Sequence, residues 1–203
     1  MTDDSTQSKR LLEYVKARGA VRAREVADAG FTRTLLYSLR DRGGLIHAGR
    51  GLFVHPEAEF SERHTLVEAA KLVSDGVICL LSAVVFHDIG TQNPRAVWMA
   101  LPRGSQRPSV GALQIRFVWF SGPAMTEGIE EHRLEGVRVS VYNLPKTIAD
   151  LFKYRKKIGI DVAVEALRDG WEHRRFTIDD LVYYAEICRV SNVIRPYLEA
   201  LTG

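Results

Sequence analysis

The stretch "VRAREVADAGFTRTLLYSLRDRGGLIHAGRGLFV", from Val21 to Val54, decides the fold of the N-terminal quarter of the chain. Apolar residues at helical spacing predict a short helix over residues 23–29. Gly30 can end this helix, because glycine adopts a left-handed conformation without a Cβ clash. Thr32 can then cap a second helix, predicted over residues 32–42 and terminated by the pair Gly43-Gly44.

Two short strands are predicted after this helix pair, over residues 45–48 and 52–54. The tight turn Gly49-Arg50-Gly51 joins them into a hairpin, and Pro56 ends the second strand because proline cannot extend a β-ladder. A further helix over residues 8–18 completes a small core. Helix, turn, helix and hairpin in this order are typical of a winged helix-turn-helix domain, which we expect over residues 1–57.

The second helix of this pair has an apolar face and a polar face. Leu35, Leu36 and Leu39 lie on one side at helical spacing, and we expect the opposite side to enter the major groove of DNA. Arg50 at the hairpin tip is suited to a minor groove or a phosphate. The candidate DNA-binding residues are Arg22, Arg24, Arg33, Thr34, Tyr37, Ser38, Arg40 and Arg50. The alternative is a packing or dimerisation module with a solvated basic face.

Charge is distributed unevenly along the chain. Residues 1–56 hold ten Lys and Arg against six Asp and Glu, whereas the remaining residues hold eighteen against nineteen. The formal net charge is only +3, so affinity for nucleic acid has to come from a local patch. The asymmetry favours phosphate neutralisation by the N-terminal part of the chain.

Composition bounds the remaining classes. A chain of 203 residues with 46% hydrophobic content fits two domains, which we expect over residues 1–57 and 58–203. Cys79 and Cys188 lack metal-ligand spacing and are predicted to be reduced core residues. The chain contains no apolar run of eighteen residues and begins with a polar segment, so a soluble cytoplasmic protein is expected.

The second domain is predicted to be α+β. Residues 77–142 are rich in β-branched and aromatic runs, with one embedded helix beginning near Ser82. From Pro145 onward the pattern is helical, over residues 145–157, 161–174, 177–188 and 191–201. Thr177 and Asp180 resemble a capping box at the start of the third of these helices. The predicted fold is therefore a winged helix-turn-helix followed by a mixed α/β domain with a helical C-terminal end.

No catalytic motif is present. The chain has no P-loop, dinucleotide fingerprint, metalloprotease, hydrolase-elbow or paired-cysteine pattern, and no acid stands two residues before a lysine. A non-enzymatic protein without metal or cofactor is expected. A metal-dependent nuclease and a ligand-sensing transcription factor remain the alternatives. The basic run from Lys153 to Lys157 is a solvated face or a second DNA contact.

The chain resembles AbiEi-type antitoxins. The resemblance rests on the winged-helix segment and then, in order, on "LLSAVVFHDIG", "VWMALPRG", "TEGIEEHRLEGVRVSVYNLPKTIADLF" and "GIDVAVEAL". It implies a repressor that binds inverted repeats in the promoter of its own type IV toxin–antitoxin operon, in an abortive-infection system. It also implies a C-terminal domain responsible for antitoxicity and for cooperative self-association of copies bound to DNA. The implied toxin is a nucleotidyltransferase-like protein of the AbiEii type, neutralised without a stable complex.

The signature "PKTIADLF" of this resemblance covers residues 145–152. No chemistry follows from Thr147 or Asp150 themselves. A threonine and an aspartate near a helix start are expected to cap backbone N–H groups and to favour the helix dipole.

Overall fold

The computed structural model describes residues 2–18, 20–49, 51–56, 63–110 and 113–202. The chain divides into two compact units, of which the first comprises Met1–Lys71 with Arg133–Arg138 and the second Leu72–His132 with Val139–Gly203. The boundary expected at residue 57 stays a prediction, because it falls among residues outside the described ranges. Within the described ranges no helix is long and apolar enough to cross a membrane.

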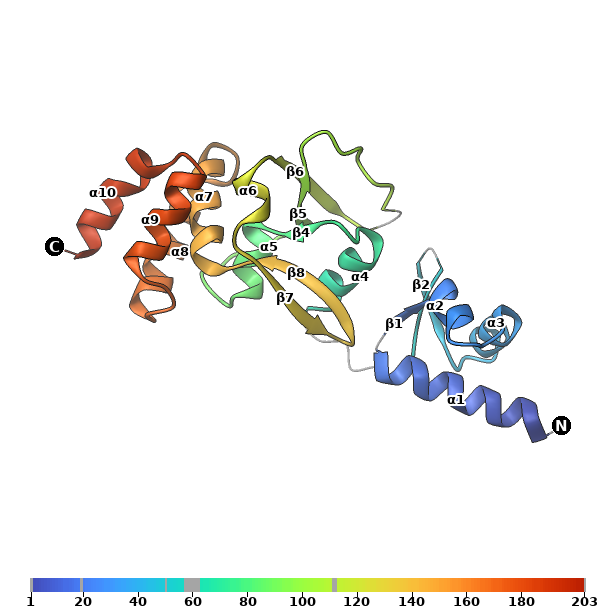
Figure 1. The fold of residues 1–203 in the computed structure, drawn as a ribbon. Coiled ribbons are helices and arrows are strands. Elements are labelled where there is room, and N and C mark those ends of the chain that lie inside the picture. The colour runs from blue at the N-terminus through green and yellow to red at the C-terminus, as the bar shows by residue number, and fades with distance from the viewer. Residues whose placement is uncertain (1, 19, 50, 57–62, 111–112, 203) are drawn as a thin grey trace. The chain divides into compact units, whose positions relative to one another are not determined.

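The first unit has the winged helix-turn-helix topology (Figure 1). Its three strands are antiparallel in the order β1-β3-β2, with Phe53 opposite Val21 on one side and His47 on the other. The elements are α1 (Thr2–Arg18), β1 (Ala20–Arg22), α2 (Ala23–Asp28), α3 (Arg33–Asp41), β2 (Ile46–Gly49), β3 (Leu52–Val54) and α4 (His64–Leu72). The strand β1 has no counterpart in the sequence-based prediction.

Local signals place the helix pair as the sequence predicts. Gly30 adopts φ +85°, and the Thr32 hydroxyl accepts a hydrogen bond from the Leu35 backbone N–H at 3.2 Å. Leu36 and Leu39 are buried, whereas Leu35 is half-buried against the same core. The remaining fully packed members of this core are Leu11, Val15, Val21, Val26, Leu45 and Phe53.

The first unit also includes the tip of a hairpin that comes from later in the chain. Gly136, at φ +75°, lies so close to α1 that an added Cβ would be 2.9 Å from the Arg18 Cα. Glu135 Oε2 lies 2.8 Å from His64 Nδ1 at the start of α4. Residues 133–138 therefore belong to the N-terminal unit in space, although the sequence places them far downstream.

The second unit is built on a mixed five-stranded sheet in the order β6-β5-β4-β8-β7. β4 pairs antiparallel with β5 and parallel with β8, and β5 pairs parallel with β6. The strands are β4 (Val77–Ile78), β5 (Val97–Pro102), β6 (Ile115–Phe120), β7 (Ile129–Leu134) and β8 (Val137–Tyr142). Two helices interrupt them, α5 (Leu80–Phe86) and α6 (Pro123–Thr126), so the expectation of one embedded helix is wrong.

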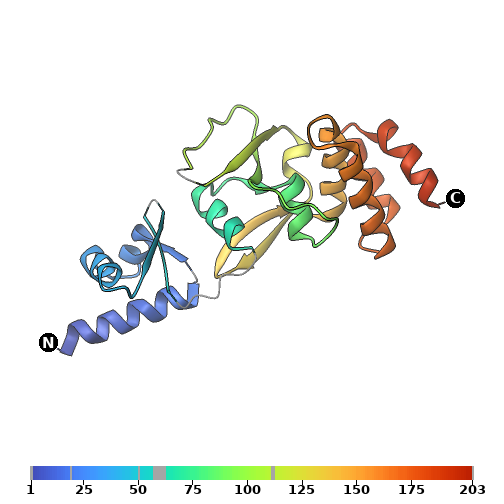
Figure 2. The same cartoon turned by 180° about the vertical axis from the view of Figure 1, so that it is seen from behind.

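Four helices form the C-terminal end, as predicted (Figure 2). α7 packs against α5, α8 and α9, and its residues from Leu144 to Phe152 are all buried. The four helices are α7 (Leu144–Ile158), α8 (Ile160–Glu172), α9 (Ile178–Ile187) and α10 (Ser191–Thr202). The predicted capping box is present, because Thr177 and Asp180 exchange hydrogen bonds at 3.1 and 3.2 Å.

The start of α7 corrects one expectation. Asn143, not Thr147 or Asp150, caps the helix by accepting a hydrogen bond from the Lys146 N–H at 3.0 Å. Thr147 instead donates to the Tyr142 carbonyl, and Asp150 pairs with Lys146 inside the core. The upstream asparagine occupies the cap, so the two residues farther along face inward. Both cysteines are free and buried, as expected.

Candidate nucleic-acid interface

The face of α3 opposite its buried leucines carries three of the candidate DNA-binding residues. Arg33, Thr34 and Tyr37 are exposed, with 39% of Tyr37 accessible. Across the described part of the chain, no carboxylate forms an ion pair with Arg33. A helix anchored by leucines and displaying a free guanidinium, a hydroxyl and an aromatic ring can present donors to base edges.

Arg40 is more constrained than the sequence predicts. Its Nε and Nη2 atoms donate to Asp41 Oδ1 at 2.8 and 2.6 Å, and its guanidinium lies 4.9 Å from the Tyr37 ring centroid. The ion pair and the stacking hold the side chain along α3. Arg40 has to leave Asp41 before it can make a bidentate contact with a base, although it can meet a phosphate from its present position. Ser38, next to it, is only half-buried.

Aromatic contacts join α3 to the hairpin. The Tyr37 ring packs edge-on against Phe53 at 5.5 Å, and His47 packs on Phe53 at 5.1 Å. The His47 Nε2 atom accepts a hydrogen bond from the Gly51 N–H at 3.2 Å, which holds the turn of the hairpin. Arg50 lies between these positions but outside the described residues. The sequence analysis did not single out His47. Its position four residues before Gly51, across the turn, is the feature that could have indicated this contact.

Arg22 and Arg24 lie at the start of α2. The Arg22 backbone N–H donates to Glu25 Oε2 at 2.6 Å, and burial together with the Arg24 charge lowers the pKa of the Arg22 guanidinium. Arg24 is exposed. The structure therefore brings a cation to the N-terminus of α2, where the Glu25 carboxylate already accepts the Arg22 backbone N–H.

Lys71 adds a cation that the sequence does not single out. Its Nζ lies 3.9 Å from Glu25 Oε2, and burial lowers its pKa to about 8, with the carboxylate opposing that shift. Glu25 is therefore shared between the Arg22 backbone and the Lys71 ammonium. This arrangement neutralises an acid that would otherwise repel phosphate close to Arg22 and Arg24.

Metal binding needs a group of ligating side chains, and thiol chemistry needs an ionisable cysteine. The described residues contain no group of three or more His, Cys, Asp or Glu side chains able to hold a metal ion. Lys146, Asp150 and Cys188 do meet, but all three are buried, and burial raises the pKa of the Cys188 thiol. A thiol kept protonated in the core is a poor nucleophile.

Comparisons with known proteins add a fold and no activity. No family model and no curated protein matches the chain. Among solved structures, the chain is similar to the crystal structure of the RV2827C protein from Mycobacterium tuberculosis, with a TM-score of 0.58 and 13% sequence identity. The match covers 89% of this chain and 71% of the other. At this identity the likeness concerns the fold alone.

Proposed function

We propose that this protein is a DNA-binding transcriptional repressor that uses α3 to read a major groove and the β2–β3 hairpin to contact the neighbouring backbone. The exposed face of α3 carries the proposal: Arg33, Thr34 and Tyr37 point away from a leucine-anchored core, and Arg33 has no acidic partner in the described ranges. The surplus of basic residues in the same part of the chain supports it.

The same proposal includes the role of antitoxin. The resemblance to AbiEi-type antitoxins favours a repressor of its own operon, acting on inverted repeats, whose second unit counteracts a nucleotidyltransferase-like toxin. The independent core of that unit supports a separable role for it. A gene for a nucleotidyltransferase-like protein next to this one would support the assignment, and expression of that toxin with and without this protein tests it directly through growth.

A mobility-shift assay with about 200 base pairs of upstream DNA tests the repressor role. The expected result is binding of the upstream fragment that survives an excess of random DNA, because specific sites typically exceed non-specific ones by a factor of about 10³–10⁷. The half-sites should be spaced by about one helical turn if two copies bind a repeat. Equal affinity for upstream and random DNA would contradict the proposal.

A further inference from the structure

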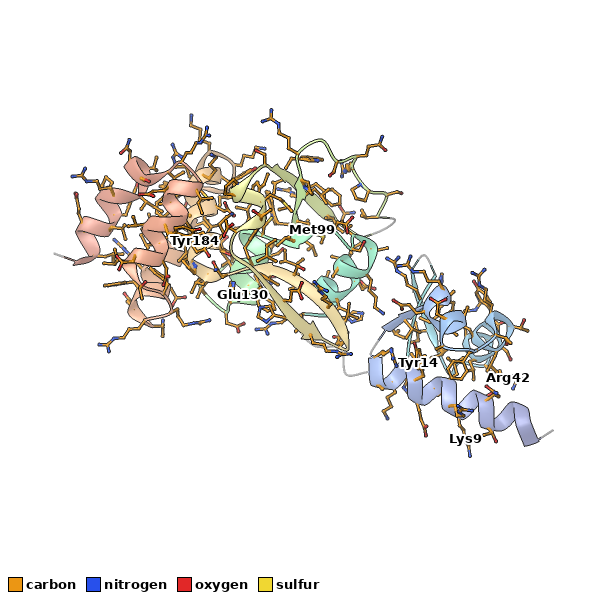
Figure 3. The ribbon with its side chains drawn as sticks, in the orientation of Figure 1. Lys9, Tyr14, Arg42, Met99, Glu130 and Tyr184 are labelled. Atoms are coloured by element: carbon orange, nitrogen blue, oxygen red, sulfur yellow. The ribbon has the colours of Figure 1, made fainter. Side chains whose placement is uncertain are left out.

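A polar cavity of about 340 Å³ lies in the second unit, where the end of α5, β7, the start of α7 and the start of α9 meet. Its volume is at the lower end of the range of about 300–1,000 Å³ that small-molecule sites occupy. Figure 3 labels two of its residues, Glu130 on β7 and Tyr184 on α9. The polar side chains that line it are His87, Glu130, Asn143, Arg175, Asp180 and Tyr184.

His87 supplies an acceptor deep in this cavity. Only 8% of the residue is exposed, and its Nε2 lies 2.7 Å from the Tyr142 carbonyl oxygen. A carbonyl can only accept, so Nε2 carries the hydrogen. Burial lowers the pKa of His87, which keeps the ring neutral and leaves a lone pair on Nδ1. Among the described residues every fully buried side-chain nitrogen or oxygen has a partner, and none is described for Nδ1, so Nδ1 keeps some accessible surface on a residue that lines the cavity.

Asn143 and Tyr184 supply a donor. The Asn143 Nδ2 donates to the Tyr184 hydroxyl oxygen at 2.8 Å, while the Asn143 backbone N–H donates to the Gly128 carbonyl at 2.7 Å. Asn143 Oδ1 also caps α7, so this side chain is held at both ends. Because the Tyr184 oxygen accepts from Asn143, its own hydrogen is left to donate elsewhere.

Three ionic groups complete the lining. The Asp180 carboxylate accepts hydrogen bonds from Thr177 through Oδ2, which lowers the pKa of Asp180 and keeps it ionised while Oδ1 remains open. Glu130 and Arg175 are both exposed residues that line this cavity, and Glu130 Oε2 also lies 3.3 Å from His132 Nε2. No carboxylate of the described chain forms an ion pair with Arg175. Two carboxylates, one guanidinium and a neutral imidazole leave one net negative charge.

We propose that this cavity binds a basic α-amino acid. A basic amino acid carries two cationic groups and one carboxylate, and this set is complementary to the lining in number and sign. Its cationic groups match Glu130, Asp180 and the Nδ1 lone pair of His87. Its carboxylate matches the Arg175 guanidinium and the Tyr184 hydroxyl, the two donors of the lining without a described acceptor.

Calorimetric titration of the full chain with L-arginine, L-lysine and agmatine tests this site. Agmatine keeps both cationic groups of arginine and lacks the carboxylate. L-arginine or L-lysine should bind saturably, and agmatine about tenfold more weakly than L-arginine, because one charge-assisted interaction is lost. Arg175→Gln should lower the affinity for L-arginine about tenfold and leave the affinity for agmatine unchanged. Glu130→Gln should lower the affinity for both ligands.

Matched controls separate the site from general charge effects. Arg174→Gln changes an exposed neighbour of Arg175, and Glu131→Gln changes the residue that alternates to the other face of β7. Both variants should bind as the parent does. Absence of saturable binding to a protein that melts cooperatively would overturn the proposal, as would equal loss in Arg174→Gln and Arg175→Gln. L-glutamate binding as tightly as L-arginine would also overturn it. DNA takes no part in these titrations, so their failure leaves the repressor proposal untouched.

Discussion

Lys146 Nζ lies 2.6 Å from Asp150 Oδ2, and both side chains are buried one turn apart on α7. The ammonium also faces the ring of Tyr142 at 4.1 Å from its centroid. The second carboxylate oxygen, Asp150 Oδ1, accepts from the Cys188 thiol at 3.1 Å. Burial raises the pKa of Asp150, and the Lys146 charge opposes that shift. The pair thereby ties α7 to the end of α9.

Lys146→Met should therefore destabilise the protein by about 3–5 kcal/mol, because it leaves a buried carboxylate without its counter-charge. Urea denaturation followed by circular dichroism measures the loss. Lys156→Met, on the exposed side of α7, is the control and should stay within about 0.5 kcal/mol of the parent. The double variant Lys146→Met/Asp150→Leu should recover most of the stability. Equal effects of the two single substitutions would contradict the assignment.

The buried thiol of Cys79 predicts a loss of stability in alkali. Burial raises its pKa well above 9.0, whereas the thiol of the unfolded chain ionises near that value. Above pH 9 the unfolded state therefore binds fewer protons than the folded state, and stability falls with pH. The contribution of this thiol is up to about 1.4 kcal/mol per pH unit. The free energy of unfolding of the parent should drop relative to Cys79→Ala between pH 8 and 10.5, and parallel curves would contradict this.

Two threonines on either side of the start of α3 should separate stability from DNA binding. Thr32→Ala removes the hydroxyl that accepts from the Leu35 N–H and should lower stability by about 1 kcal/mol. Thr34→Ala lies on the exposed face and should change stability by less than about 0.5 kcal/mol. If α3 reads DNA, only Thr34→Ala should weaken operator binding once both proteins are fully folded. Thermal melts and mobility shifts on the same samples make the comparison.

Gly128 is expected to tolerate no side chain. It adopts φ +77°, and an added Cβ would lie 2.9 Å from Lys146 Cβ and 3.1 Å from Tyr184 Cε1. Gly104 has φ +93° and no atom within 4 Å of such a Cβ. A substitution at Gly104 therefore measures the cost of the backbone conformation without a steric clash. Gly104→Ala should lower stability by about 1–2 kcal/mol, and Gly128→Ala by about 1–3 kcal/mol more. Similar melting temperatures of the two variants would show that the packing around Gly128 is looser than described.

Arg33→Ala tests the reading of bases. If Arg33 contacts a guanine edge, the substitution should cost about 1–3 kcal/mol of operator affinity and flatten the preference at one base pair. Binding to random DNA should hardly change. Arg10→Ala, an exposed cation on α1 of the same unit, serves as the control for net charge. A loss of equal size on operator and random DNA would assign Arg33 to phosphate instead.

Local chemistry is what the sequence predicts well. Gly30, Thr32 and the Thr177–Asp180 pair act within one helical turn, so their roles follow from spacing alone, and the structure confirms each. The leucine face of α3 follows from periodicity in the same way. The exposure of Arg33, Thr34 and Tyr37 is a consequence of that period.

Long-range pairing is what the sequence could not supply. The three-residue strand β1 exists because β3 offers it a partner, and the parallel pairing of β4 with β8 joins residues far apart in the chain. As charged residues, Lys146 and Asp150 would be expected on the surface of a helix. Their burial depends on contacts with Tyr142 and Cys188, which the local sequence of the helix does not reveal. The pairing of Arg40 with Asp41 was also missed, because adjacent positions on a helix do not face each other and only the length of the arginine side chain allows it.

The placement of residues 133–138 beside α1 limits how the N-terminal unit can be produced by truncation. A clone that stops at residue 71 omits Gly136 and Glu135, and so uncovers the backbone of Arg18 and leaves His64 without that carboxylate. Deletion of residues 1–71 instead removes the contacts that Arg18 and His64 make with the hairpin tip. Truncation from one end therefore cannot yield an intact N-terminal unit.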